Sequence, residues 1–225
     1  IDLLVRAFCR AERDSVLICP PTFGMYKVSA RVQGAGVVEV PLLKEQGFAF
    51  DVDSVLATWR EGIKLVFVCS PNNPTANLIE RGVLERLCEA LTDRALVVLD
   101  EAYIEFAQTD SAVQLLERFP KLVILRTLSK AYALAGARCG AVLAHPDIVS
   151  LLARVITPYA LPAPTIEAVL RLTDTAHQAQ AQARIAEVLA ERARVAEALG
   201  RTACIRRIWP SATNFLLVEC ADAAQ

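Results

Sequence analysis

The sequence predicts an α/β fold built around a mainly parallel sheet. Short apolar runs alternate along the chain with segments of helical periodicity, the pattern of repeated strand–helix–strand units. Apolar residues make up 54% of the 225 residues and the mean hydropathy is +0.37, which indicates strands buried on both faces. This length allows one large domain, or one domain and part of a second.

Six short apolar segments are the candidate strands of the sheet. They cover residues 15–19, 37–41, 64–69, 95–99, 122–125 and 139–144. Their lengths match those of ordinary strands, and polar or turn-forming residues follow most of them.

Several segments between the strands predict helices. Residues 2–8 read as a helix, and residues 78–91 carry apolar side chains at helical spacing, with Asn77 in the N-cap position. Residues 111–118 predict a shorter helix. Residues 147–156 predict another, since Pro146 suits a first helical turn.

Three prolines, Pro158, Pro162 and Pro164, interrupt regular structure and mark a boundary. We therefore expect residues 1–160 to form a large α/β domain. Residues 161–225 are expected to form a linking helix, over residues 165–199, and part of a small α+β domain. Residues 203–209 and 213–219 would supply two strands of its sheet.

Composition and charge exclude several classes of protein. The 24 Lys and Arg residues nearly balance the 25 Asp and Glu residues, and no basic stripe suggests nucleic-acid binding. No apolar stretch approaches the ~20 residues that span a bilayer. The seven cysteines are odd in number and contain no CxxC pair, so we expect reduced thiols in a cytoplasmic protein and no metal site. No glycine-rich turn follows the first strand, which disfavours a nucleotide-binding dehydrogenase.

Polar side chains follow three successive strands at the point where each strand ends. Asn73 follows the third strand, Asp100 the fourth, and Thr127, Ser129 and Lys130 the fifth. Ligands of open α/β sheets lie beyond the carboxyl ends of the strands. If the sixth strand is antiparallel, as its short connection allows, Arg138 begins it at the same edge.

This set of groups suits pyridoxal phosphate. An amine can bond to the cofactor aldehyde, a carboxylate can pair with the ring nitrogen, and hydroxyls with a guanidinium can hold the phosphate. Each residue alone has an ordinary alternative: Asp100 as a cap, Asn73 before Pro74 as a turn residue, and Arg138 as a surface ion pair. The agreement of independent placements favours the cofactor site.

Several runs of sequence carry a resemblance to a known family. They are residues 20–26 (PPTFGMY), 70–75 (SPNNPT), 100–103 (DEAY), 126–132 (RTLSKAY) and 134–140 (LAGARCG). With them the chain resembles the fold-type I, class-II pyridoxal-phosphate-dependent aminotransferases, and within these the histidinol-phosphate aminotransferases. The resemblance implies an aspartate-aminotransferase-like three-layer α/β/α sandwich with a mostly parallel sheet, and a homodimer.

The resemblance also implies residue roles. Lys130 would be the catalytic residue, forming the Schiff base and moving the proton. The other cofactor contacts would be Phe23 stacked on the ring, Asp100 at the ring nitrogen, Asn73 and Tyr103 at the phenolic oxygen, and Thr127, Ser129 and Arg138 at the phosphate. Tyr26 and Asn73 would approach the substrate. For Phe23 the alternative to ring stacking is a packing role, because an aromatic residue near two prolines is often only a packing residue.

The implied reaction exchanges an amino group between histidinol phosphate and 2-oxoglutarate in L-histidine biosynthesis, giving imidazole-acetol phosphate and glutamate. Shared motifs leave open an aromatic aminotransferase or an amino-acid-phosphate decarboxylase. A third alternative is a catalytically incompetent pyridoxal-phosphate-binding fragment or structural protein.

Two departures from the family pattern stand out. Ala76 occupies a position where the family usually has glycine, and a positive φ there would cost about 1 kcal/mol. The glycine-led phosphate-binding turn expected before Ile1 and the late substrate arginine are not in the sequence, and the helix at residues 2–8 has no cap. These observations favour a segment of a longer protein, with a naturally short chain as the alternative.

Overall fold

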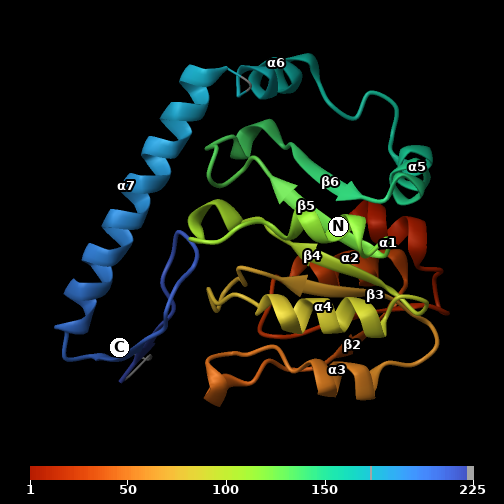
Figure 1. The fold of residues 1–225 in the computed structure, drawn as a ribbon, viewed down its shortest axis with the longest axis horizontal. Coiled ribbons are helices and arrows are strands. Elements are labelled where there is room, and N and C mark those ends of the chain that lie inside the picture. The colour runs from red at the N-terminus through yellow and green to blue at the C-terminus, as the bar shows by residue number, and fades with distance from the viewer. Residues whose placement is uncertain (173, 222–225) are drawn as a thin grey trace.

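The computed structural model describes residues 1–172 and 174–221, and its centre is a six-stranded sheet in the order β2-β1-β3-β4-β5-β6 (Figure 1). The strands are β1 (Ser15–Ile18), β2 (Gly36–Glu39), β3 (Ile63–Cys69), β4 (Leu96–Asp100), β5 (Leu122–Thr127) and β6 (Gly140–Ala144). Strands β1 to β5 pair in parallel, and β6 pairs antiparallel with β5. The predicted strands and the direction of the sixth are confirmed.

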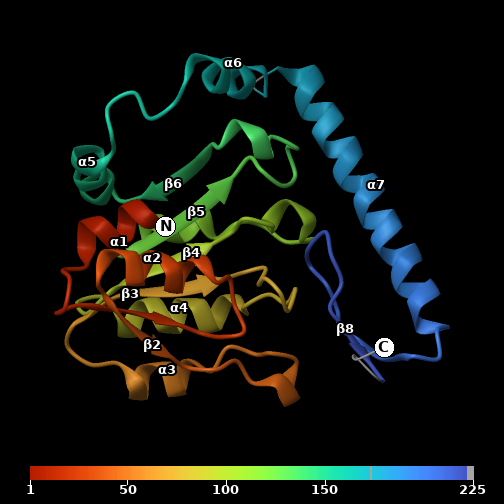
Figure 2. The same cartoon turned by 180° about the vertical axis from the view of Figure 1, so that it is seen from behind.

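Helices cover both faces of the sheet (Figures 1 and 2). One face carries α3 (Val52–Thr58), α4 (Arg81–Ala90) and the 3-10 helix η3 (Ala112–Glu117), and the other carries α1 (Asp2–Phe8), α2 (Met25–Gln33) and α5 (Pro146–Val155). Alternate residues of β3 supply the two cores: Val66 and Val68 face one, and Leu65 and Phe67 the other. This three-layer α/β/α sandwich is the predicted fold.

The predicted start of the helix at residue 78 is wrong, because α4 begins at Arg81 after the N-cap Glu80. Asn77 does not cap the helix. Its side-chain amide donates to the carbonyl oxygen of Phe48 at 2.9 Å, so it fixes the loop before the helix. Residues 112–117 form a 3-10 helix, with the Ser111 hydroxyl accepting from the Val113 amide. Helices α2 and α3 had no sequence-based prediction.

The predicted single helix over residues 165–199 is wrong. The chain forms α6 (Ala163–Arg171) and α7 (Thr175–Gly200), and the extended backbone of Asp174, the N-cap of α7, separates them. Aspartate favours this cap position over a helix interior. The long α7 then leads to the small antiparallel sheet at the other end of the molecule (Figure 1).

The small sheet is shorter than predicted. It pairs β7 (Ile205–Ile208) with β8 (Val218–Cys220), and residues 213–217 are not part of a strand. The reason is local: the Ser211 and Thr213 hydroxyls both reach the carbonyl oxygen of Phe215, at 2.6 and 3.1 Å, and hold a turn. The expected domain boundary at residue 160 falls between α5 and α6 and stays a prediction.

This C-terminal segment packs beside the carboxyl ends of the large sheet. The Ala212 amide donates to the Ala76 carbonyl at 2.8 Å, and the Phe215 ring meets Tyr103 edge-on at 5.3 Å between centroids. Residues from both parts of the chain therefore shape the region beyond the strand ends.

Candidate active site

A pocket lies at the carboxyl ends of β3 and β4, where the sequence predicts the site. Its lining residues are Phe23, Cys69, Asn73, Asp100, Ala102, Tyr103 and Lys130. Cys69 and Asp100 are register partners on the parallel strands β3 and β4, so the residues that follow them emerge side by side. Five of the eight predicted cofactor contacts thus line one pocket.

Three of these side chains form one wall. The Asn73 side-chain amide nitrogen lies 3.4 Å from the Tyr103 hydroxyl oxygen, and Lys130 Nζ lies 5.3 Å from the centre of the Tyr103 ring. The Tyr103 ring also meets Phe215 edge-on, a contact that restricts its orientation. Two hydrogen-bond donors and an amine therefore converge on the same space.

Asp100 forms the floor of the pocket and is buried, at 6% exposure. Its Oδ2 accepts from the Tyr26 hydroxyl at 2.7 Å, and its Oδ1 accepts from the Ala102 amide at 3.1 Å. Burial raises the pKa of Asp100 above its ordinary value, and the two hydrogen bonds oppose that rise. A cation entering the pocket would meet a desolvated carboxylate.

Two aromatic residues lie near this carboxylate. Phe23 lines the pocket, and its ring meets Tyr26 edge-on at 5.7 Å. Tyr26 is fully buried and stacks on Phe67 with 4.6 Å between centroids. The structure therefore places Tyr26 behind Asp100, outside the pocket lining where a substrate contact was expected.

The predicted phosphate ligands lie outside the lining of the pocket. The Thr127 hydroxyl donates to Ser129 Oγ at 3.0 Å and accepts from the Ser129 amide at 3.2 Å, so the two hydroxyls form a pair. Arg138 is exposed, has a positive φ of 54°, and donates to the Ala135 carbonyl at 2.9 Å.

Gly140 allows β6, which follows Arg138, to pair closely with the end of β5. Gly140, at the start of β6, pairs with Thr127, and a Cβ on it would lie 2.8 Å from the Arg126 carbonyl oxygen. Only glycine permits this close approach of β6 to β5.

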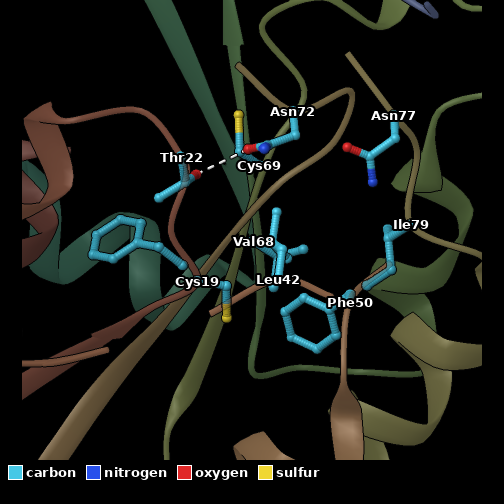
Figure 3. A pocket seen from close by; sticks show the side chains of 10 residues that line it. Cys19, Thr22, Leu42, Phe50, Val68, Cys69, Asn72, Asn77 and Ile79 are labelled. Carbon is cyan, nitrogen blue, oxygen red and sulfur yellow. Dashed lines mark hydrogen bonds between the residues drawn. The ribbon is translucent and has the colours of Figure 1, made fainter. Parts of the chain in front are cut away.

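Sequence reasoning missed Asn72, which connects the loops that carry Phe23 and Asn73. Its side-chain amide donates to the Pro21 carbonyl at 2.8 Å, and its oxygen accepts from the Thr22 hydroxyl at 2.9 Å. Figure 3 shows Thr22 and Asn72 side by side at the edge of a neighbouring pocket, which Cys69 also lines. The adjacent asparagines between Pro71 and Pro74 were the available signal.

A partly buried charge cluster was also missed. Arg126, at the end of β5, lies 2.7 Å from Glu105 and 3.5 Å from Glu101. Glu101 is 2% exposed and accepts from the Ser111 hydroxyl at 2.6 Å and the Ala112 amide at 2.8 Å. The cluster holds the strand that leads to Lys130 against the loop that carries Tyr103.

Ala76 has a φ of 62° and is fully buried, so the position does have the left-handed backbone that glycine favours.

Across residues 1–172 and 174–221, no group of three or more His, Cys, Asp or Glu side chains is placed to hold a metal ion. No helix in the same part of the chain is long and apolar enough to cross a membrane.

Comparison with known proteins gives a consistent result. Residues 1–225 match the family described as aminotransferase class I and II. The chain is 47% identical over 227 residues to histidinol-phosphate aminotransferase 2 of Idiomarina loihiensis, covering 100% of the chain and 63% of the relative. It is 48% identical over 225 residues to histidinol-phosphate aminotransferase of Stenotrophomonas maltophilia, covering 99% of the chain and 62% of the relative. The chain thus spans less than two thirds of these relatives.

Solved structures share the fold. The histidinol-phosphate aminotransferase of Clostridium acetobutylicum matches with a TM-score of 0.83 and 23% identity, over 97% of this chain and 64% of that one. An aspartate aminotransferase of Thermus thermophilus matches with a TM-score of 0.84 and 24% identity, over 96% and 58%. An L-threonine-O-3-phosphate decarboxylase of Porphyromonas gingivalis matches with a TM-score of 0.79 and 24% identity, over 98% and 65%.

Proposed function

The chain belongs to the class I and II aminotransferase family, and from this we propose that it functions as a pyridoxal-phosphate-dependent histidinol-phosphate aminotransferase. The observation that carries the proposal is the pocket shared by Asn73, Asp100, Tyr103 and Lys130. The proposed substrates are histidinol phosphate and 2-oxoglutarate, as the names of the relatives suggest for the amino donor.

The donor set of the pocket fits the cofactor. The buried Asp100 carboxylate accepts from two uncharged donors and from no Lys or Arg side chain of the described residues, so it can take a protonated ring nitrogen. Asn73 and Tyr103 would donate to the phenolic oxygen, and Phe23 would cover the ring face. Thr127, Ser129 and Arg138 would hold the phosphate, with two hydroxyls and a guanidinium.

When bound, pyridoxal phosphate supplies an aldehyde that an amino group can attack and a ring that accepts an electron pair. Lys130 would hold the cofactor through its Nζ amine and, when that amine is free, would act as the base that carries a proton from the substrate carbon. Asp100 would keep the ring nitrogen protonated through its negative charge. Tyr103 and Asn73 would fix the ring plane by hydrogen bonding.

We also propose residues 1–160 as the cofactor-binding domain, with residues 161–225 as a linking segment and part of a second domain. A homodimer and a cytoplasmic location stay predictions, to be measured by light scattering and by fractionation.

The test uses the 225-residue chain and the Lys130→Ala variant. Purified protein is mixed with pyridoxal phosphate, treated with borohydride, and digested, and the modified peptide is identified by mass spectrometry. We expect the adduct on Lys130 in the unmodified chain and its loss in the variant, with transaminase turnover lowered by several orders of magnitude where turnover is measurable.

Lys121→Ala is the matched control, because Lys121 is exposed and lies at the opposite end of β5. It should label and turn over as the unmodified chain does. An adduct retained in Lys130→Ala would contradict the assignment. Product analysis with histidinol phosphate separates amino transfer from decarboxylation, and a spectrum unchanged by the cofactor would favour a non-catalytic protein.

A further inference from the structure

The Asp100 carboxylate is held from behind by one side chain that the proposed chemistry does not use. Tyr26 donates its hydroxyl to Oδ2 at 2.7 Å, while the Ala102 amide occupies Oδ1 at 3.1 Å. A carboxylate oxygen accepts more than one hydrogen bond, so both oxygens keep accepting capacity on the pocket side.

The position of Tyr26 is fixed by its ring contacts. The ring stacks on Phe67 at 4.6 Å with an interplanar angle of 11°, and it meets the Phe23 ring edge-on at 5.7 Å. Burial raises the pKa of Tyr26 well above its ordinary value, so the hydroxyl stays protonated and faces Asp100 as a donor.

The other titratable groups near Asp100 do not replace this donor. Cys69, on the neighbouring strand, is a neutral thiol, since burial raises its pKa to about 12. Lys130 shares the pocket but makes no ion pair with Asp100, and the Ile1 amino group at the start of α1 acts through its charge without a hydrogen bond. Among the described residues, Tyr26 is therefore the side-chain donor that stabilises the ionised form.

We propose that Tyr26 is a positioning residue, which holds the Asp100 carboxylate ionised and directed into the pocket for a cationic ring nitrogen. The inference rests on the proposed function, in which Asp100 pairs with that nitrogen. It gives Tyr26 a role at the cofactor in place of the substrate contact expected from the sequence.

Tyr26→Phe tests the proposal, because it removes the hydroxyl and keeps the ring that packs on Phe67. Tyr159→Phe is the matched control, since Tyr159 is 99% exposed. The first readout needs no cofactor: carboxyl carbons of aspartate are followed by NMR across pH, and Asp100→Asn identifies the Asp100 signal. All variants carry the same N-terminus, so the contribution of the Ile1 amino group cancels.

We expect the Asp100 titration midpoint to move up by about one pH unit in Tyr26→Phe, because the ionised form loses a hydrogen bond. The affinity for pyridoxal phosphate, measured by fluorescence titration, should fall about tenfold. Tyr159→Phe should change neither quantity. An unmoved midpoint would overturn the proposal, and so would a moved midpoint with unchanged cofactor affinity.

Two further arms keep the outcomes distinct. If Tyr26→Phe fails to fold, replacement of Tyr26 by p-aminophenylalanine keeps a weaker donor in place, and a smaller upward shift is then expected; no shift would count against the role. If the unmodified chain binds no pyridoxal phosphate, the proposed function fails. The carboxyl titration then still decides whether Tyr26 holds Asp100 ionised.

Discussion

The two ends of the large sheet each bury an aspartate, and they hold it in opposite ways. Asp14, before β1 at the amino end, accepts from the Arg10 amide at 2.9 Å and from its guanidinium at 2.8 and 3.2 Å. These hydrogen bonds with Arg10 lower the pKa of Asp14 to about 2. At the carboxyl end, Asp100 has two uncharged donors, and burial raises its pKa.

The difference shows how one residue type serves two purposes. Asp14 has its counter-charge within the turn, so its charge is satisfied and the turn is held. Asp100 is desolvated without a hydrogen-bonded cation among the described residues, so it retains the capacity to bind one from a ligand.

The two ends of the large sheet also differ in which residues have positive φ angles. Gly34 and Gly62, before strands at the amino end, have positive φ angles of 76° and 97° and bear them without strain. At the carboxyl end, Ala76 and Arg138 have positive φ angles without being glycine. Glu12 at the amino end and Gly47, which follows β2 at the carboxyl end, are exceptions. Strain of this kind gathers near functional sites.

The largest expected effect separates the two aspartates by ligand binding. Asp100→Asn should weaken pyridoxal phosphate binding by about 100-fold, because a buried partner of the ring nitrogen loses its charge. Asp14→Asn should stay within about twofold of the unmodified chain, since its carboxylate faces Arg10. Fluorescence titration at neutral pH measures both. Equal losses in the two variants would show that the ends do not differ in function.

The second prediction concerns stability against pH. Asp14 has a lowered pKa, so its contribution is present above about pH 4 and lost as pH falls toward 2. Asp100 has a raised pKa in the folded state, so as pH rises its carboxyl group ionises in the unfolded chain before it does in the folded chain. The folded state therefore loses stability above about pH 4.

Urea unfolding at several pH values checks both signs. Asp14→Asn should lower the free energy of unfolding by about 1 kcal/mol at neutral pH and by almost nothing near pH 2. The loss at neutral pH is small because the Arg10 side chain is 61% exposed to solvent. Asp100→Asn should gain stability relative to the unmodified chain as pH rises from 4. Parallel profiles for the two variants would contradict the comparison.

The smallest expected effect tests the strained backbone. Ala76→Gly should raise the free energy of unfolding by about 0.5 to 1 kcal/mol, because glycine adopts a φ of 62° without a Cβ clash. Ala90→Gly, at the end of α4, should instead cost about 1 kcal/mol or less. Thermal or urea unfolding compares them. A loss in both variants would mean that the methyl group of the buried Ala76 outweighs the strain.

The strands of the large sheet could be predicted because each is a short apolar run that ends in polar residues, and this is local information. The pocket residues Asn73, Asp100 and Lys130 followed from the same pattern, since parallel strands bring their carboxyl ends to one edge. The ends of the helices were harder to predict from the sequence. Residues 78–80 and Asp174 have side chains that fit a helical pattern, but loop and cap contacts decide their conformation.

The sequence by itself determined the layered fold and the groups at its carboxyl edge, because periodicity and strand order fix both. Only the tertiary structure decided which side chains hold those groups in place through hydrogen bonds. Tyr26 and Asp100 are 74 positions apart, and their hydrogen bond depends on how α2 packs against the sheet. Asn72 likewise joins two loops that are 50 positions apart. Such contacts depend on packing between distant elements, and no local pattern along the chain encodes them.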